Sequence, residues 1–446
     1  MNAPLRDYQA KALFAVAHEG YQYLGLEQGL GKSRILIEYA KLEGARRILV
    51  FCPASVRLSW ETEVAKWWSD APPVVLVNSV KQITNHPGIF VMSYDRISRG
   101  EDYVKAIGLV MPFDLAFADE AHYAKNLEAK RTKHLFRAVL PKVGKMILAS
   151  GTPAPNHAGE LYPALRFLAP EKIMKADGRP MTQTQFEDAF CRIEQKFFNG
   201  RQTRVITGSQ NIPALRERLN GFLLRMRKSE VLTELPPLEF VPTPLAPSLA
   251  GIEANALRGY SDILSEDMSD EQVLAALGSM DENAARLRVA LGVAKANAAI
   301  EYIDEFMDGS QKKIVVWAIH QNVIDILMSG LKHLGAVKID GRTPEKDRRY
   351  AIAAFLGDAN TRVFIGNIQA AGTGLTLIGP QFPCSDAFFV ESDYVPGNNL
   401  QAAARIHRLG QRDGVLARVF FARKTIDDRV QSILARKQNE LAQIFN

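Results

Sequence analysis

Short apolar runs alternate with amphipathic segments in the first third of the chain. Compact apolar runs bounded by turn residues are typical of buried strands, and apolar residues at helical spacing are typical of helices that cover a sheet. Parallel strands are joined by such helical crossovers, so this order predicts a parallel α/β sheet. The strand-like runs lie at 21–27, 46–53, 73–78, 88–94, 113–120 and 145–150, and helix-like stretches such as 33–42 and 55–68 separate them.

The alternation stops at about residue 157 and resumes after residue 308. The final stretch, 425–446, begins with Thr425 and places Asp428 three residues on, which resembles a capping box and predicts a C-terminal helix. Before it, we expect strands at 312–319, 337–340, 362–367, 387–392 and 415–423, and helices at 321–335, 344–357 and 398–410.

Pro236 and Pro237 mark a natural boundary between the two α/β regions, because a proline pair interrupts both helices and central strands. The predicted fold class is therefore α/β, with two lobes of parallel sheet flanked by helices. The expected lobes are 1–235 and 236–446, with helical insertions at about 157–230 and about 248–308.

Composition narrows the class of protein. The 446 residues are 47% hydrophobic and 23% charged, which is typical of a soluble globular protein with more than one domain. No apolar run approaches the roughly 20 residues that span a bilayer, and the N-terminus has no apolar signal core, so we expect a cytoplasmic protein with access to DNA. Cys52, Cys191 and Cys384 lack metal-ligand spacing and are expected to be free thiols. The net charge of +6 is compatible with a polyanionic partner.

The stretch GLEQGLGKS follows a strand-like run and opens a helix-like one. It matches the phosphate-loop spacing G-x-x-x-x-G-K-[ST], except that Leu26 stands where the first glycine belongs. Gly29 and Gly31 let backbone N–H groups turn toward phosphate oxygens. Lys32 adds positive charge, and the Ser33 hydroxyl can ligate magnesium. A glycine-rich turn without a ligand is the alternative.

A pair of carboxylates ends the strand-like run FDLAFADE, where Asp119 and Glu120 are adjacent. Ligands of α/β domains bind at the carboxyl ends of strands. An aspartate there can hold the magnesium that bridges phosphates, and a glutamate can orient and deprotonate an attacking water. A solvated acidic turn is the alternative, but the phosphate loop upstream favours hydrolysis.

Several longer motifs occur in a fixed order along the chain. They are LRDYQAKAL, EQGLGKS, VFCPASVRLSWETEVAKW, VMSYDRIS, DEAH, SGTPAPN, FLLRMRKSEVLTELPP, IDGRTP, NIQAAGTGLTL and QAAARIHRLGQ. In this order they resemble the motifs of the Swi/Snf-type ATPases of helicase superfamily two, whose phosphate loop also lacks the first glycine. The GTGLTL form is most similar to the annealing-helicase branch of that family.

The resemblance implies two RecA-like lobes, with ATP in a cleft and nucleic acid lying across both lobes. It implies that Lys32 contacts the β- and γ-phosphates of ATP. Ser33 and Asp119 would hold Mg²⁺, and Glu120 would activate water. Gln9 would read the adenine base with Arg6 close by. The remaining implied ATP contacts are Glu27, Gln28, Gly29, Leu30 and Gly31, and the implied arginine fingers from the second lobe are Arg405 and Arg408.

The resemblance also implies residues that couple hydrolysis to DNA contact. The family often has acidic residues where this chain has Ala403 and Ala404, so the chain departs from the pattern there. We interpret His122 and His407 as hydrogen-bonding residues rather than metal ligands, because no partner ligands are spaced around them. The implied coupling residues are Ser150 and Thr152 in the first lobe, and Gly341, Gly372, Thr373, Gly374 and Gln401 in the second.

Two segments are candidates for direct DNA contact. Tryptophans 60, 67 and 68 in SWETEVAKWW could stack on bases. Val56, Trp60, Val64 and Trp67 follow helical spacing, however, and this favours a core role. The basic run LLRMRK contains Arg225, Arg227 and Lys228, which would form either a DNA contact or a solvated basic face.

The function expected from the sequence is an ATP-dependent motor that tracks along double-stranded DNA. Forked or branched duplexes are candidate substrates. Alternatives are a strand-separating helicase, a motor subunit of a restriction or repair complex, and a nucleic-acid clamp switched by ATP binding alone. The intact DEAH motif argues against the clamp, because the hydrolytic glutamate is present.

Overall fold

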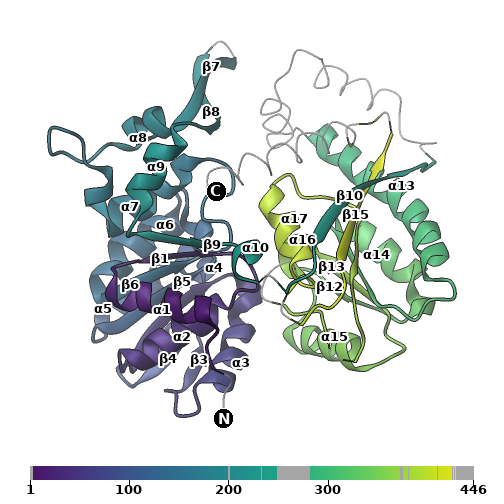
Figure 1. Ribbon diagram of the computed structural model, residues 1–446, viewed down its shortest axis with the longest axis horizontal. Helices are drawn as coiled ribbons and strands as arrows, with labels where there is room; N and C mark the ends of the chain where they lie inside the picture. Colours follow the sequence, from purple (N-terminus) through teal and green to yellow (C-terminus); the bar gives the residue numbers. More distant parts are fainter. Residues whose placement is uncertain are drawn as a thin grey trace. The chain divides into compact units, whose positions relative to one another are not determined.

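A computed structural model describes residues 4–198, 201–232, 234–248, 282–371, 375–379, 381–408, 410–423, 425 and 427. The chain divides between residues 233 and 234 into two compact units, each built around a parallel sheet of its own (Figure 1). The division falls close to the proline pair of the sequence. Residues 249–281 of the expected insertion at about 248–308, and most of the expected C-terminal helix at 425–446, lie outside the described residues.

The first unit contains a seven-stranded sheet, and every strand pair described in it is parallel. Its central strands are buried along their whole length, as in a sheet with helices on both faces. The strands are β1 (Tyr23–Leu26), β2 (Arg47–Cys52), β3 (Val74–Leu76), β4 (Gly88–Ser93), β5 (Phe113–Asp119), β6 (Val143–Ala149) and β9 (Leu223–Met226), in the order β3-β4-β2-β5-β6-β1-β9.

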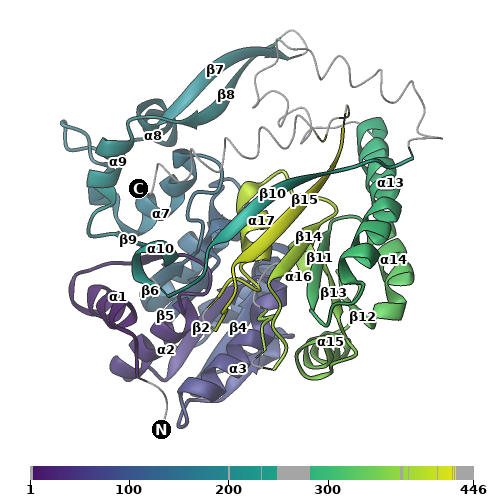
Figure 2. The same cartoon turned by 45° about the vertical axis from the view of Figure 1, so that its right-hand side comes forward.

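Helices of the first unit follow the strands as the sequence predicted (Figure 2). The order of strands places the carboxyl ends of β1 and β5 on the same edge of the sheet, with β6 between them. The main helices are α1 (Asp7–His18), α2 (Lys32–Leu42), α3 (Arg57–Trp67), α4 (Tyr94–Arg99), α5 (Glu101–Leu109), α6 (Lys130–Lys133), α7 (Tyr162–Leu168), α8 (Gln183–Phe190), α9 (Ile212–Leu219) and α10 (Lys228–Val231).

The insertion at 157–230 is not purely helical, which corrects the prediction. Strands β7 (Cys191–Phe198) and β8 (Arg201–Ser209) form an antiparallel hairpin between α8 and α9. Cys191, Ile193 and Ile206 of the hairpin pack in or against the core of the first unit. The strands of the hairpin are mostly polar, so they lacked the apolar run that marks the buried strands. Further on, β9 joins the main sheet beside β1.

The second unit contains a six-stranded sheet in the order β10-β15-β14-β11-β13-β12, again with parallel pairs throughout the described strands. Apolar clusters lie on its two faces. The strands are β10 (Leu238–Leu245), β11 (Ile314–Ala318), β12 (Ala336–Ile339), β13 (Val363–Asn367), β14 (Asp386–Phe389) and β15 (Val415–Ala422). The main helices are α13 (Glu282–Met307), α14 (Gln321–Gly330), α15 (Glu345–Gly357), α16 (Ile368–Ala371) and α17 (Pro396–Ala403).

Two elements of the second unit differ from the prediction. Strand β10 was not expected, because Pro242 and Pro244 interrupt it. It lies at the edge of the sheet, where β15 is its one neighbour among the described strands, and an edge tolerates residues without an N–H donor. Helix α17 ends at Ala403, whereas a helix was expected over 398–410, and the chain continues in turns.

Both units have the predicted layout, and the fold class of two RecA-like α/β lobes is confirmed. Cys52, Cys191 and Cys384 are buried free thiols, as expected. Among the helices described, none is both long and apolar enough to cross a membrane.

Candidate nucleotide site and coupling motifs

The loop between β1 and α2 has the backbone that a phosphate cradle requires. Gly29 and Gly31 have φ values of 86° and 79°, in the left-handed region where residues with a Cβ are disfavoured. A Cβ on Gly31 would also lie 2.4 Å from Nε2 of Gln9. Gly31 therefore serves both the turn and the close approach of α1. The N-terminal N–H groups of α2 follow directly, and such groups attract anions.

The residues expected to read adenine lie against this loop. Gln9, in the first turn of α1, is buried, and its Nε2 donates a 3.3 Å hydrogen bond to the carbonyl of Leu30. Its Oε1 accepts from the backbone N–H of Arg6 at 3.1 Å. The side chain of Gln9 is thus fixed by contacts at both of its polar atoms.

Lys32 and Ser33 are the first two residues of α2. Lys32 is buried, and its Nζ donates to the carbonyl of Leu26 at 3.0 Å. The ammonium therefore lies across the mouth of the loop, where β1 ends. Ser33 is half-buried on the first turn of the helix.

The carboxylate pair stands at the end of β5. Glu120 has φ 51° and ψ 50°, a left-handed conformation that is costly for a residue with a side chain and is typical of functional sites. Oδ1 of Asp119 accepts from the Glu120 N–H at 3.0 Å. Both carboxylates are buried, and Oε2 of Glu120 has no hydrogen-bond partner among the described residues.

Burial and, next to it, the neighbouring charge of Glu120 raise the pKa of Asp119 to about 6, while the charge of Lys32 opposes both effects. The ionised form of the buried Asp119 is therefore disfavoured, and a cation at this point would stabilise it. Magnesium is held in such sites by one or two carboxylates together with phosphate oxygens and water. The oxygen-only donor set of Asp119 and Ser33 fits Mg²⁺. The described residues contain no cluster of three or more His, Cys, Asp or Glu side chains that would form an all-protein cage.

Trp60 is a site residue whose role the sequence did not reveal. Its side chain is 1% exposed, and its Nε1 donates a 3.0 Å hydrogen bond to Oδ2 of Asp119. Its ring stacks on Phe117 of β5, with centroids 6.2 Å apart. The core interpretation of Trp60 is confirmed, and it leaves no ring face for a DNA base. The indole also orients the carboxylate expected to bind magnesium.

The other members of the tryptophan helix are partly as predicted. Val56 and Val64 are buried. Trp67, expected in the core, is only half-buried, with the Arg34 guanidinium 3.8 Å from its ring centroid, whereas Trp68 is buried in its place. Helix α3 ends at Trp67, so the helical spacing no longer determines the direction of the next side chain.

His122 connects the carboxylates to the SGTPAPN motif. Its Nδ1 lies 2.8 Å from Oγ of Ser150 and 3.4 Å from Oε2 of Glu120. Oγ of Ser150 also accepts from the N–H of Thr152 at 3.1 Å. Burial lowers the pKa of His122 to about 3, with Lys125 acting in the same direction, so the ring is neutral at physiological pH. The hydrogen-bonding interpretation of His122 is confirmed.

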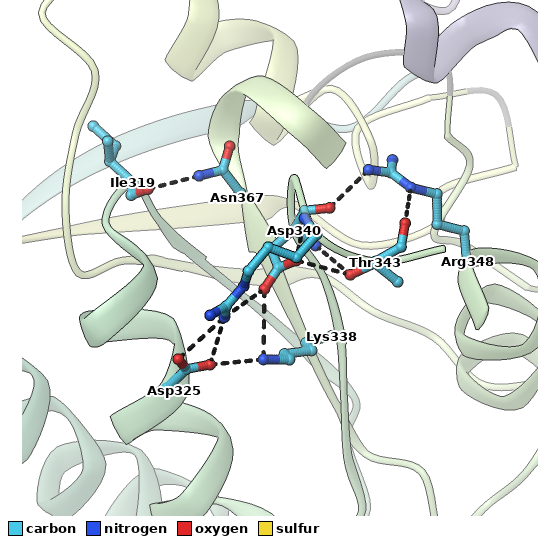
Figure 3. A network of polar contacts seen from close by, with 8 residues as sticks. Ile319, Asp325, Lys338, Asp340, Thr343, Arg348 and Asn367 are labelled. Carbon is cyan, nitrogen blue, oxygen red and sulfur yellow. Dashed lines mark hydrogen bonds and ion pairs between the residues drawn. The ribbon is translucent and has the colours of Figure 1, made fainter. Parts of the chain in front are cut away.

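In the second unit, the IDGRTP motif forms a polar network at the end of β12 (Figure 3). Asp340 is almost fully buried, and its Oδ1 accepts from the Thr343 hydroxyl at 3.0 Å and from the Arg342 N–H at 2.8 Å. Arg342 and Lys338 both bridge Asp340 to Asp325 on α14. Gly341 lies within this braced turn.

Arg348 of α15 ties the turn to the next motif. Its guanidinium donates to the carbonyls of Asp340 at 2.7 Å, Thr343 at 3.0 Å and Ala370 at 3.1 Å. Ala370 precedes Gly372, Thr373 and Gly374, which lie outside the described residues. Nδ2 of Asn367, at the end of β13, donates to the carbonyl of Ile319 at 2.6 Å (Figure 3).

The two predicted finger arginines converge on one carbonyl. Nη1 of Arg405 and Nη1 of Arg408 donate to the carbonyl of Leu375 at 3.1 and 2.9 Å. Nε of Arg405 also donates to the carbonyl of the buried Gln401 at 2.9 Å. Arg405 is 2% exposed, whereas Arg408 is half-buried. These contacts place both arginines beside the GTGLTL motif, and their role as fingers stays a prediction.

The departure at Ala403 and Ala404 has a packing reason. Both side chains are buried in the second unit, where an acidic side chain would lose its hydration. Nearby, Nε2 of His407 lies 2.8 Å from the carbonyl of Pro236, which confirms its hydrogen-bonding role.

Comparison with known proteins agrees with this arrangement. Residues 22–243 match the model of the SNF2-related domain. The chain is 29% identical to the DNA annealing helicase and endonuclease ZRANB3 of Mus musculus, over 97% of this chain and 40% of that protein. It is 27% identical to the Caenorhabditis elegans homologue of SWI/SNF-related matrix-associated actin-dependent regulator of chromatin subfamily A-like protein 1, over 97% of this chain and 60% of that one. The chain thus spans about half the length of these relatives.

Among solved structures, the Sulfolobus solfataricus SWI2/SNF2 ATPase core in complex with dsDNA is 19% identical, with a TM-score of 0.42, covering 100% of this chain and 93% of that one. The family match and the relatives agree with the ordered motifs. The chain belongs to the SNF2-type ATPases of helicase superfamily two, near the annealing-helicase branch.

Proposed function

We propose that the chain is a motor that couples ATP hydrolysis to movement along double-stranded DNA. Residues 1–235 would act as the helicase ATP-binding domain and 236–446 as the helicase C-terminal domain. The observation that carries the proposal is a series of close polar contacts. Nδ1 of His122 lies 3.4 Å from Oε2 of Glu120 and hydrogen-bonds to Oγ of Ser150, which in turn accepts from the N–H of Thr152. These contacts give the hydrolytic carboxylate a physical link to a motif expected to sense DNA.

The residues of the first unit support ATP hydrolysis in defined roles. Lys32 and the N–H groups of the glycine loop would hold the phosphates, and Gln9 would contact the base. Asp119 and Ser33 would hold Mg²⁺, which neutralises charge on the phosphates when it is bound. Glu120 would orient the attacking water and accept its proton. The buried Oε2 of Glu120, without a hydrogen-bond partner among the described residues, suits that role.

Double-stranded DNA is the favoured track for two reasons. A translocating motor must hold phosphates rather than bases, because base contacts would confine it to one sequence. The relatives named above include a DNA annealing helicase. Remodelling, annealing and branch migration of forked or branched duplexes are the activities that such a motor would drive. A strand-separating helicase and a motor subunit of a larger complex are the alternatives.

Displacement of a third strand from a DNA triplex tests the proposal. A duplex translocase should release the third strand in the presence of ATP and Mg²⁺, and Lys32→Ala should not, because it removes the charge that holds the phosphates. Affinity for duplex DNA should fall with salt at a log–log slope of about 0.9 per phosphate contacted. A protein that unwinds forked duplexes readily but leaves the triplex intact would be a strand-separating helicase.

A further inference from the structure

Arg225 of β9 makes contacts that a solvated basic residue does not make. Strand β9 pairs with β1, and Arg225 is the register partner of Gly25. Nη1 of Arg225 donates to the carbonyl of Gly25 at 2.7 Å and to the carbonyl of Gly151 at 2.9 Å. Nη2 lies 3.7 Å from Oε1 of Glu27. One guanidinium therefore contacts two backbone carbonyls and one carboxylate.

The surroundings of Arg225 are buried. Its side chain is 18% exposed, and burial lowers its pKa despite the nearby charge of Glu27. Lys228 is also buried, and its backbone N–H donates to Oε2 of Glu27 at 2.8 Å. One carboxylate oxygen of Glu27 thus pairs with the guanidinium, and the other accepts a hydrogen bond from the first N–H of α10. These contacts exclude a solvated basic face at Arg225 and Lys228.

The three contacted residues belong to two segments of the nucleotide site. Gly25 and Glu27 flank the end of β1, where the phosphate loop begins. Gly151 lies between Ser150 and Thr152, the segment that His122 contacts. The two segments also pack directly together, because a Cβ on Gly151 would lie 2.2 Å from Nε2 of Gln28 in the phosphate loop. If a contact holds the phosphate loop and residues 150–152 together, a movement of one segment therefore displaces the other.

We propose that Arg225 is a positioning residue that locks the phosphate loop to the 150–152 segment. The inference rests on the proposed ATPase function and adds a second route of communication, which does not pass through His122. The planar guanidinium suits this role, because its donors are fixed in a fork and can satisfy two carbonyls and a carboxylate at once. The ammonium of a lysine is a single flexible point charge and cannot reproduce that geometry.

Arg225→Lys tests the lock in the full chain, and Arg218→Lys is its matched control. Arg218 of α9 also donates through Nη1 to two carbonyls, those of Lys172 at 2.8 Å and Met174 at 3.2 Å, but neither belongs to a motif. We expect Arg225→Lys to lower kcat for ATP by about 10- to 100-fold, because a small misplacement of reacting groups costs this much. Its Tm should fall no further than that of Arg218→Lys. Parental turnover in Arg225→Lys, or an equal loss in both variants, would overturn the proposal.

A double-variant cycle adds a readout that a general loss of stability would not produce. Glu27→Gln removes the ion pair but leaves both carbonyl contacts, so its loss of turnover should be smaller. Combined with Arg225→Lys, it should add little further loss, because contacting residues are not additive. Fully additive losses would contradict the lock, and the single Glu27 variant keeps the test available if Arg225→Lys does not fold.

Two further measurements distinguish this proposal from a direct DNA contact by Arg225 and from a failure of the proposed motor function. Affinity for duplex DNA should be the same in Arg225→Lys as in the parental chain, and a selective loss of DNA affinity would make Arg225 a DNA contact instead. Turnover and affinity for ATP are also measured without DNA. A parental chain that DNA does not stimulate would refute the proposed motor, while the difference between Arg225→Lys and Arg218→Lys without DNA would still decide the lock.

Discussion

Glu120→Gln should lower ATP turnover by at least about 10²-fold, which is the lower range for loss of a general base. Glutamine keeps nearly the same shape but cannot accept the proton of the attacking water. Since Glu120 already adopts a left-handed backbone conformation at the end of β5, the substitution leaves the strain and the turn in place. ATP binding should therefore remain close to that of the parental chain.

Lys32→Ala is the matched comparison, because it should lose ATP binding as well as turnover, whereas Glu120→Gln should lose turnover alone. Lys32 is buried at the start of α2, and its loss removes the charge facing the phosphates. We expect weaker ATP binding as well as lost turnover. Titration with a fluorescent ATP analogue and single-turnover hydrolysis separate the two variants. Parental hydrolysis by Glu120→Gln would show that another residue acts as the base.

Arg408→Ala should lose DNA-stimulated turnover by about 10³- to 10⁵-fold, the usual value of an arginine finger. Arg408 belongs to the second unit and Lys32 to the first. The proposed finger role therefore requires a state in which both units contact the same nucleotide. DNA that contacts both lobes would favour closure through its differential affinity for the closed state. Turnover would then depend on DNA without direct contact between DNA and ATP.

Packing is the competing explanation for Arg408, since its Nη1 also holds the carbonyl of Leu375. Arg405→Ala is a useful comparison, because the buried Arg405 bonds to Leu375 and to Gln401 and its loss should lower Tm markedly. Arg408→Ala should retain ATP binding, DNA binding and a Tm near the parental value. A large fall in the Tm of Arg408→Ala, or retention of most of its DNA-stimulated turnover, would show that Arg408 is not an arginine finger.

The hydrophobic pattern predicted the buried strands well, because strands covered on both faces read as continuous apolar runs. The run at 113–120 became β5, with Asp119 as its last residue, and the stretch 33–42 became most of α2. Polar or proline-containing strands were missed. The hairpin of β7 and β8 is rich in charged residues, and β10 contains Pro242 and Pro244. Neither kind of strand needs an apolar run, since one projects from the core and the other lies at a sheet edge.

The candidate site was predicted as a set of residues but not as a set of contacts. Sequence spacing identified Trp60 as a core residue, yet its hydrogen bond to Asp119 depends on how α3 packs against β5. The run LLRMRK suggested a surface, because three basic residues in four positions are usually solvated. Pairing of β9 with β1 instead buries Arg225 against Glu27. Such long-range pairings have no local signal in the sequence.

ATP turnover measured side by side with double-stranded DNA, single-stranded DNA and RNA tests the central claim most directly. A motor that tracks along duplex DNA should be stimulated by double-stranded DNA well above its basal rate, and by single-stranded DNA or RNA much less. Glu120→Gln should remain inactive with all three, which shows that the measured turnover belongs to this site. Equal stimulation by all three nucleic acids, or turnover that double-stranded DNA leaves unchanged, would contradict the account.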